Sequence, residues 1–299
     1  MDTLVNIKVV HTDSKKANEA IKVAFGEIER IECLMDFYHP ESGVSKINRS
    51  QGEMLEVAPE IIDVITTSLR YSELTKGAFD ITIGPLIKLW GFKKGEGIPD
   101  REKLREALKL VGYQKIKVDR EGKTVMLLQP GAMIDLGGVA KGYAVTKACQ
   151  RLKDMGISSA LIDAGGDIQV MGGKFGRPWR LGVQHPREKN RLTAILELNE
   201  GAVATSGDYE RFFIFKDRRY HHILDPVTGF PARECISVTI TAASCLVADI
   251  LSTAVFILGP DEGMRLIEEM EGVEGIIVTE EGVLFSTGIE RFIVVGDHL

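Results

Sequence analysis

A carboxylate and a hydroxyl stand four residues apart in the apolar segment SCLVADILSTAVFILG, which its hydrophobic pattern predicts to be a helix. At that spacing Asp249 and Thr253 project from the same face of a helix. Hard cations such as Mg²⁺ bind oxygen ligands of this kind, with carbonyl groups, water and substrate phosphates completing the coordination. The pair therefore indicates a metal site. The alternative is a structural hydrogen bond from Asp249, with Thr253 bonded back to its own helix.

The segment IDLGGVAKG places an acid, two glycines and a lysine at a predicted junction between a strand and a helix. Backbone N–H groups at a helix N-terminus attract anions, and glycine lets a ligand approach the backbone closely. Asp135 and Lys141 are thus candidates for contact with a nucleotide diphosphate. The segment matches neither the Walker A pattern nor a complete G-x-G-x-x-G pattern, so the alternative is a glycine-tightened turn with a solvated Lys141.

Two adjacent histidines occur in the segment RRYHHILDPVTGFPA, between a predicted strand and a turn. Because side chains alternate along a strand, His221 and His222 point to opposite faces, and only one of them can face a common site. Imidazole titrates near neutral pH, so His222 is the candidate base for an attacking hydroxyl, and a structural histidine is the alternative. Ser206 lies upstream without a G-x-S-x-G motif, which argues against a serine hydrolase triad.

Two aromatic side chains occupy segments where a planar ring system could stack on them. Tyr38 follows the first predicted helix, and Phe79 lies in the segment GAFDITIGP. For each of them, a place in the ordinary hydrophobic core is the alternative.

The elements that must position these residues are predicted from hydrophobic spacing and capping residues. A helix with its N-cap at Ser14 runs to about Met35, and a second helix begins at Pro59 and stops at Gly77. Residues 78–92 mix alternation with Gly and Pro, so we expect an ordered but irregular segment there. The second helix is expected to bury four aliphatic side chains, Ile62, Ile65, Leu69 and Leu74.

The second half of the chain is predicted to be rich in β-structure. A charged helix over 101–110 precedes a helix that opens after the glycine pair of IDLGGVAKG and is capped by Gly156. Short β-rich runs separated by Gly, Asp and Asn follow, which favours hairpins. Two late helices, 245–258 and 261–270, precede closing strands. The sequence thus predicts an α+β fold with a largely antiparallel β-sheet core and flanking helices.

The composition is that of a globular protein, because 44% of the 299 residues are hydrophobic and can form a sizeable core. No Pro/Ser-rich linker marks a boundary, so residues 1–299 are expected to form a single domain. The net charge of −6 comes from interspersed acids and bases, which argues against nucleic acid as a partner. The four cysteines are isolated, and we expect them to be small buried core residues.

The N-terminal residues, MDTLVNIKVV, have the pattern of a strand and not that of an export signal. No apolar run reaches the roughly 18 residues of a membrane-spanning helix. A cytoplasmic protein and a mature form whose leader has been removed both fit this pattern.

A set of segments in a fixed order resembles the ApbE-type FAD:protein FMN transferases over nearly the whole chain. These segments are FYHPESGVSKIN, GAFDITIGPLIKLWGF, IDLGGVAKGYAV, LIDAGGDI, ATSGDYERF, RYHHILDPVTGFPA and SVTITAASCLVADILSTAVFILG. The resemblance implies an enzyme that uses Mg²⁺ to transfer FMN from FAD to a Thr or Ser hydroxyl of an acceptor flavoprotein, with release of AMP. It also implies an FAD site between the sheet and the helix-rich parts of an ApbE-like fold.

The resemblance further implies which residues serve the site. FAD would contact Met1, Tyr38, Ala78, Phe79, Asp80, Asp135, Lys141, His222 and Ile223. The metal would be held by the backbone carbonyl of Gly138 together with Asp249 and Thr253, and His222 would act as the base. This chain begins M-D-T where the family has M-G-T, so Asp2 puts a close approach of this strand to the flavin in doubt.

Two other functions are alternatives to protein flavinylation. With water in place of the acceptor hydroxyl, the same site would be an Mg²⁺-dependent FAD pyrophosphatase that yields FMN and AMP. Without turnover, the chain would be an FAD-binding carrier. The resemblance implies acceptors among subunits of redox pumps and a lipoprotein of the bacterial inner membrane that faces the periplasm, with a cytoplasmic location as the alternative. Both a monomer and a homodimer fit the sequence.

Overall fold

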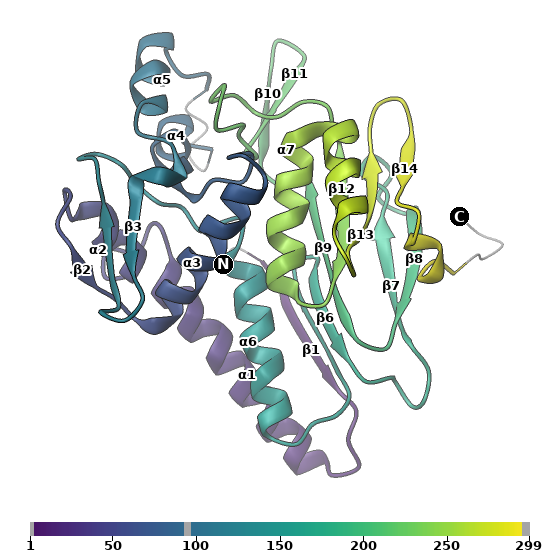
Figure 1. The fold of residues 1–299 in the computed structure, drawn as a ribbon. Helices are drawn as coiled ribbons and strands as arrows, with labels where there is room; N and C mark the ends of the chain where they lie inside the picture. Colours follow the sequence, from purple (N-terminus) through teal and green to yellow (C-terminus); the bar gives the residue numbers. More distant parts are fainter. Residues whose placement is uncertain (1–2, 93–96, 295–299) are drawn as a thin grey trace.

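The main sheet of this computed structural model has seven strands, all paired antiparallel, in the spatial order β1-β5-β6-β9-β12-β13-β14 (Figure 1). The structure describes residues 3–92 and 97–294. In the order given, the strands span Val5–Val9, Ala160–Ala164, Asp167–Met171, Gly201–Gly207, Ser237–Ala242, Glu274–Val278 and Val283–Phe285. With helices packed on it, this sheet confirms the predicted α+β class with a largely antiparallel core.

Three long helices form a layer on one face of the sheet (Figure 1). Helices α6 (Ala140–Asp154) and α7 (Cys245–Glu269) pack directly on the strands, and α1 (Ser14–Met35) packs against α6. The first half of α7 is apolar on nearly all sides because it is buried between the sheet and its neighbouring helices, and Phe256 is inaccessible to solvent.

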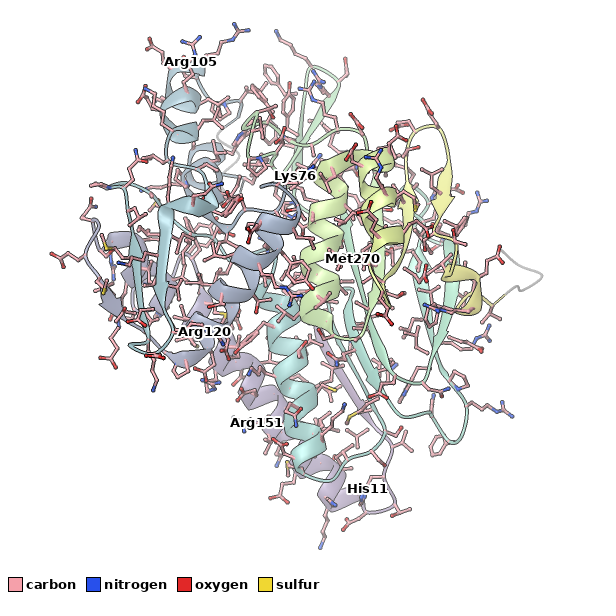
Figure 2. All side chains as sticks on the ribbon, viewed as in Figure 1. His11, Lys76, Arg105, Arg120, Arg151 and Met270 are labelled. Atoms are coloured by element: carbon pink, nitrogen blue, oxygen red, sulfur yellow. The ribbon has the colours of Figure 1, made fainter. Side chains whose placement is uncertain are left out.

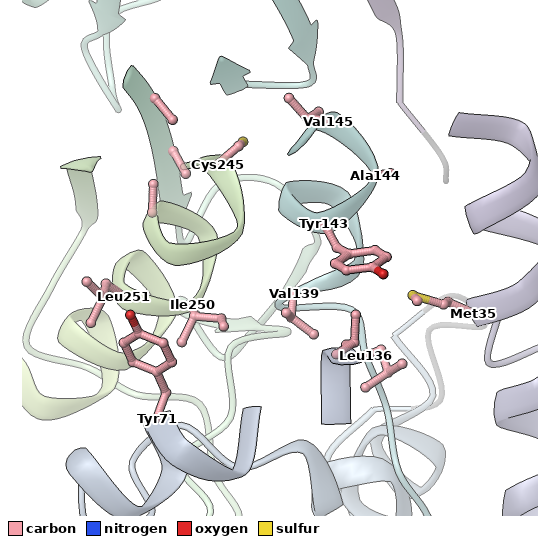
Figure 3. Close-up of a cluster of buried hydrophobic side chains, with 14 of the residues drawn as sticks. Met35, Tyr71, Leu136, Val139, Tyr143, Ala144, Val145, Cys245, Ile250 and Leu251 are labelled. Carbon is pink, nitrogen blue, oxygen red and sulfur yellow. The ribbon is translucent and has the colours of Figure 1, made fainter. Parts of the chain in front are cut away.

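The largest hydrophobic core fills the space between this helical layer and the sheet. Figure 3 shows part of it, with Met35 of α1 directed toward Leu136 and Tyr143, and Tyr71 directed toward Ile250 of α7. Burial of each large apolar side chain contributes about 1.5–3 kcal/mol to the stability of the fold. The core thereby fixes the relative positions of α6 and α7, which both line the functional site.

A separate hairpin covers part of the opposite face of the sheet. Strands β7 (Trp179–Gln184) and β8 (Leu192–Leu198) pair with each other and form a second core with Leu161, Val170 and Val203 from the main sheet. The alternating buried and exposed pattern of β7 is that of a strand with one solvated face. The main sheet is thus packed on both faces.

The remaining elements surround one end of the helical layer. The helices are α2 (Gly43–Arg49), α3 (Pro59–Leu74), α4 (Gly84–Trp90) and α5 (Arg101–Leu108), with short 3-10 helices at Ile81–Ile83, Tyr113–Lys115 and Ile289–Arg291. The strands are β2 (Leu55–Glu56), β3 (Ile116–Asp119) and β4 (Thr124–Leu127), which pair in the order β2-β4-β3, and β10 (Phe212–Phe215) with β11 (Arg218–His221). A third core around the fully buried Trp90 joins α4 to the β10–β11 hairpin.

The first two predicted helices are present, but two details of the prediction were wrong. Asp13, and not Ser14, caps α1, because its side chain accepts hydrogen bonds from the backbone N–H groups of Lys15 and Lys16 at 2.8 and 3.2 Å. Leu74 is 48% exposed, since α3 ends at this residue and its last turn faces outward.

The prediction of an irregular segment at 78–92 was also wrong in part, because residues Gly84–Trp90 form the helix α4. Pro85 lies in the first turn of α4, and Gly91 ends it with a left-handed φ of 55°. The Gly and Pro residues that suggested irregularity are in fact the start and stop signals of a short helix.

The two predicted late helices form one element, α7, which is kinked at Gly259 and Pro260. Gly259 has a φ of 83°, which separates the two helical parts.

The prediction that all four cysteines are buried was wrong for Cys33. This residue lies on the solvent-exposed side of α1, whereas the other three cysteines are buried.

Charged side chains cover the outside of the molecule, with Arg105 near one end and His11 near the opposite end of the view in Figure 2. Within residues 3–92 and 97–294, no helix is both long enough and apolar enough to cross a membrane.

Candidate functional site

A cavity of about 410 Å³ opens where the N-terminal part of α6, the first half of α7 and the end of β9 meet the loops that follow α1 and α3. Its size lies within the range of sites for small molecules and cofactors. All the site residues named from the sequence that the structure describes line this cavity: Tyr38, Ala78, Phe79, Asp80, Asp135, Gly138, Lys141, His222, Ile223, Asp249 and Thr253. Met1 lies outside the described residues, as does Asp2.

Asp249 joins α7 to the N-terminal end of α6. Its Oδ2 accepts a hydrogen bond of 2.9 Å from the backbone N–H of Gly142, one of the N–H groups that the first turn of a helix leaves unpaired. A Cβ on Gly142 would lie 2.7 Å from the Cβ of Asp249, so glycine is required for this close approach. The carboxylate of Asp249 therefore sits at the positive end of the α6 dipole.

Thr253 lies one turn after Asp249 and also faces the cavity. Its hydroxyl is 3.2 Å from the hydroxyl of Ser206 on β9, and Ser206 is 2.9 Å from Ser252. The hydroxyl that bonds back to α7 is that of Ser252, which donates to the Asp249 carbonyl at 3.0 Å. Thr253 is thus held from β9 and is directed toward Gly138, where an added Cβ would lie 3.4 Å from the Thr253 Oγ1.

A buried cluster of charges adjoins these residues. Lys141 donates a hydrogen bond to Asp167, whose side chain is almost fully buried. Burial, and next the negative charge of Asp249, raise the pKa of the Asp167 carboxyl. Burial alone would lower the pKa of Lys141, but the carboxylates of Asp167 and Asp249 raise it. One ammonium group thus faces two acids in this buried corner, and the carboxylates keep the Lys141 ammonium protonated.

The donor atoms in this corner fit a hard divalent cation. They are a carboxylate on Asp249, a hydroxyl on Thr253 and the backbone of Gly138, whose missing side chain leaves room beside Thr253 and the Phe79 ring. Among the described residues, no group of three or more His, Cys, Asp or Glu side chains could hold a metal ion. A carboxylate, a hydroxyl and a backbone carbonyl suit a cation of the Mg²⁺ type, which keeps few protein ligands and binds substrate phosphates.

The two histidines differ as strand alternation predicts. His221 is buried, stacks edge-on against Phe256 and shares a 2.8 Å hydrogen bond through Nε2 with the Ala232 carbonyl. His222 lines the cavity, and its Nδ1 is buried with no hydrogen-bond partner among the described residues. Burial, and next the positive charge of Arg211, lower the pKa of His222 to about 4, so its ring is neutral and able to accept a proton at pH 7.

Asp80 and Asp135 shape the loops that form the opposite side of the cavity. Asp80 accepts hydrogen bonds from the Thr82 N–H and hydroxyl at 2.8 and 2.6 Å and from the Tyr113 N–H at 2.7 Å. Asp135 accepts from the Gly137 N–H at 2.7 Å. Both carboxylates thus hold backbone segments in place as well as lining the cavity.

The two aromatic residues differ in their exposure. Tyr38 is 54% exposed at the mouth of the cavity, where its ring meets Phe37 edge-on. Phe79 is buried in the main core and presents only part of its ring to the cavity. Tyr38 is therefore the better placed of the two to stack on a bound ring system.

Sequence reasoning missed two residues that line or support the site, and it considered a third, Ser206, only as a hydrolase nucleophile. Asp167 contacts Lys141 from the start of β6, Ser206 contacts Thr253 from β9, and Arg211 lines the cavity next to the hairpin. The segments LIDAGGDI and ATSGDYERF contain all three of them, but only the fold brings these residues to one place.

Comparison with known proteins places this architecture in a family. A model of the family described as ApbE matches residues 1–277. The chain belongs to the ApbE family. A Vibrio cholerae relative named "FAD:protein FMN transferase" is 31% identical over 291 residues, which cover 94% of this chain and 86% of that protein. An Escherichia coli K12 relative of the same name is 31% identical over 96% of this chain and 84% of its own length.

Solved ApbE structures have the same fold. The ApbE protein of Thermotoga maritima superposes with a TM-score of 0.90 at 37% identity, covering 98% of this chain and 99% of that one. The flavin transferase ApbE of Vibrio cholerae superposes with a TM-score of 0.85 at 30% identity, covering 98% and 96% of the two chains.

Proposed function

We propose that this chain is an FAD:protein FMN transferase, which moves FMN from FAD to a Thr or Ser hydroxyl of an acceptor flavoprotein with Mg²⁺ and releases AMP. The observation that carries the proposal is the convergence of the predicted FAD and metal residues on one cavity. The names of the Vibrio cholerae and Escherichia coli relatives support the same reaction.

In the proposed reaction, the acceptor hydroxyl attacks the phosphorus atom of the FMN half of FAD. A bond forms between the hydroxyl oxygen and that phosphorus, and the bond from the phosphorus to the oxygen of the AMP phosphate breaks. His222 accepts the proton of the hydroxyl, which its neutral ring at pH 7 allows. The negative charge that develops leaves with AMP, so the products balance.

Charge neutralisation is the main task of the corner near α6 and α7. Asp249, Thr253 and the Gly138 carbonyl would hold Mg²⁺, which when bound neutralises charge on the diphosphate. The Lys141 ammonium, kept protonated beside Asp167, lies in the same corner and attracts the phosphates of FAD. These groups are held in place before substrate binds, which is the arrangement that stabilises a charged transition state.

The flavin ring is assigned to the mouth of the cavity. Tyr38 would stack on the ring, while the loop that contains Ala78, Phe79 and Asp80 and the backbone near Ile223 would hold its edges. The diphosphate would then lie at the α6 end of the cavity, with Lys141 to attract its phosphates and His222 to accept the proton of the hydroxyl.

Incubation with FAD, Mg²⁺ and an acceptor protein that the Vibrio cholerae relative modifies, followed by mass spectrometry, tests the proposal. An FMN adduct on a Thr or Ser, with an equal amount of AMP, is the expected result. Release of FMN and AMP without an adduct would instead identify an FAD pyrophosphatase. Bound but intact FAD would identify a carrier, and either result would overturn the transferase.

The proposal also covers the acceptor proteins, the cellular location and the oligomeric state of the chain. We expect the acceptors to be subunits of membrane redox pumps and the chain to work at the periplasmic face of the bacterial inner membrane. Cell fractionation would distinguish this location from a cytoplasmic one. Light scattering would show whether the chain forms a homodimer.

A further inference from the structure

The β10–β11 hairpin connects two residues of the cavity wall and projects away from it. Arg211 immediately precedes β10 and His222 immediately follows β11, and both line the cavity. Figure 1 shows the hairpin extending beyond the end of α7, next to α4. A molecule bound to the hairpin would therefore lie at the rim of the cavity, near the candidate base His222.

The hairpin is anchored at its base and on one face. Phe213 and Tyr220 stack with their ring centroids 5.4 Å apart and pack on Trp90. Asp208, just after β9, accepts two hydrogen bonds of 2.7 Å from Arg187 and one of 3.0 Å from Arg219 of β11. An isolated two-stranded hairpin is marginally stable in water, so these contacts hold it in a defined position.

Apolar side chains remain exposed on this anchored hairpin. Ile214 is 64% exposed, and Phe212 and Phe215 of the same strand are also exposed. Within the described residues β10 pairs only with β11, so its outer edge also presents backbone hydrogen-bonding groups. Exposed aromatic and aliphatic groups beside arginines are typical of protein interfaces.

The charge of the hairpin differs from that of the chain. Residues 210–219 contain four basic and two acidic side chains, a net charge of +2, whereas the whole chain carries −6. At the tip, Lys216 and Asp217 have φ values of 48° and 58°, a conformation for which Asn-Gly would be the relaxed choice. Backbone strain of this kind is often kept where a side chain serves a contact.

From this geometry we propose that the exposed hairpin surface, formed by Phe212 and Ile214 on the free face and by Phe215, Lys216 and Arg218 around the tip, docks the polypeptide that accepts FMN. The inference rests on the proposed function. The acceptor hydroxyl must reach His222 inside the cavity, so the acceptor backbone has to cross the rim from which the hairpin rises. The basic and apolar surface fits an extended acceptor segment that combines apolar with acidic side chains.

The test compares two substitutions at exposed apolar positions on edge strands. Ile214→Asp alters the hairpin surface, and Leu284→Asp alters β14, where Leu284 is 42% exposed and does not line the cavity. The acceptor is a protein that the Vibrio cholerae relative modifies. Its KM is measured at saturating FAD, and its Kd is measured with a form whose modified Thr or Ser is replaced by Val.

We expect Ile214→Asp to raise both the KM and the Kd for the acceptor by about tenfold or more. The Kd for FAD and the circular dichroism spectrum should remain those of the wild type, and Leu284→Asp should change none of these quantities. Arg218→Glu should also raise the KM and the Kd for the acceptor, and the increase should be larger at low salt than at high salt.

Several results would overturn the inference. One is an acceptor KM and Kd for Ile214→Asp within about twofold of those of Leu284→Asp. Another is loss of binding to phosphatidylglycerol vesicles with no change toward the acceptor, which would make the hairpin a membrane contact. A wild-type chain that binds the acceptor without modifying it contradicts only the proposed function. A wild-type chain that neither binds nor modifies the acceptor contradicts both proposals.

Discussion

The two sides of the cavity differ in how completely their polar groups are engaged by the protein. At the junction of α6 and α7, Asp249 binds the Gly142 N–H, Lys141 binds Asp167, and both carboxylates are almost fully buried. On the hairpin side, His222 has a buried Nδ1 with no hydrogen-bond partner among the described residues, and the neighbouring hairpin exposes apolar groups. The junction is preformed, whereas the hairpin side is arranged for contact with a further molecule.

This difference separates the expected effects of mutation. Substitutions at the junction should damage the chemistry, and those that disturb the packing of α6 on α7 should also lower the stability. Substitutions on the hairpin side should leave the fold and FAD binding intact and should change the step that involves the acceptor.

The largest effect is expected from Asp249→Asn. The amide oxygen can still accept the hydrogen bond of Gly142, but the negative charge that would hold the cation is lost. We expect Mg²⁺-dependent turnover to fall by about 10³-fold, which corresponds to about 4 kcal/mol, with a nearly unchanged Tm. Retained turnover in this variant would remove Asp249 from the metal site.

Next in size is the effect of His222→Asn on transfer. Loss of the proton acceptor should lower kcat by about 10²-fold or more while the Kd for FAD stays near that of the wild type. Single-turnover transfer measured with saturating FAD provides the rate, and fluorescence quenching provides the Kd. A wild-type rate would show that another group, or water, takes the proton.

The lowered pKa of His222 also predicts how stability depends on pH. The ring has a pKa of about 4 in the folded protein, against about 6.5 in an unfolded chain. As the pH falls through this window the unfolded state binds the proton first, so the free energy of unfolding decreases by at most about 3 kcal/mol. Urea titrations at pH 7 and pH 5 should show a smaller decrease for His222→Asn. The remaining decrease includes His221, whose pKa burial also lowers.

Gly142→Ala tests the close packing at the junction. Alanine normally stabilises a helix relative to glycine, but a Cβ here would meet Asp249 and the backbone of Cys245. We expect a loss of about 2 kcal/mol in the free energy of unfolding. Gly26→Ala is the matched control in α1, because a Cβ there meets nothing within 4 Å. The control should be neutral or more stable by about 0.5–1 kcal/mol.

Ser206→Ala should have the smallest effect of the series. It removes the hydroxyl that contacts Thr253 and leaves Thr253 free to rotate. We expect the Mg²⁺ concentration for half-maximal activity to rise by about tenfold or less, with kcat at saturating Mg²⁺ preserved. A loss of kcat that added Mg²⁺ cannot restore would assign Ser206 a more direct part in the chemistry.

The sequence predicted those features that local spacing determines. The span of α1, the fold class and the separate environments of His221 and His222 follow from hydrophobic period, turn residues and strand alternation. The resemblance to the ApbE family supplied the set of residues that meets in the cavity.

The missed features depend on contacts between distant segments. Asp167 and Lys141 lie 26 residues apart in the sequence, and Ser206 and Thr253 lie 47 apart, so no local pattern pairs them. The anchoring of the hairpin by Asp208 likewise requires residues from one strand and two loops. The helix at Gly84–Trp90 was missed because its capping residues were interpreted as breaks in structure.

In the proposed site, the corner formed by Gly138, Asp249 and Thr253 holds a divalent cation against the diphosphate of FAD. A crystal structure with FAD and Mn²⁺, with anomalous scattering used to locate the metal, tests it most directly. We expect an Mn²⁺ bound to the Asp249 carboxylate, the Thr253 hydroxyl and the Gly138 carbonyl, and in contact with the diphosphate. An Mn²⁺ ion bound elsewhere, or a diphosphate far from Asp249, would contradict it.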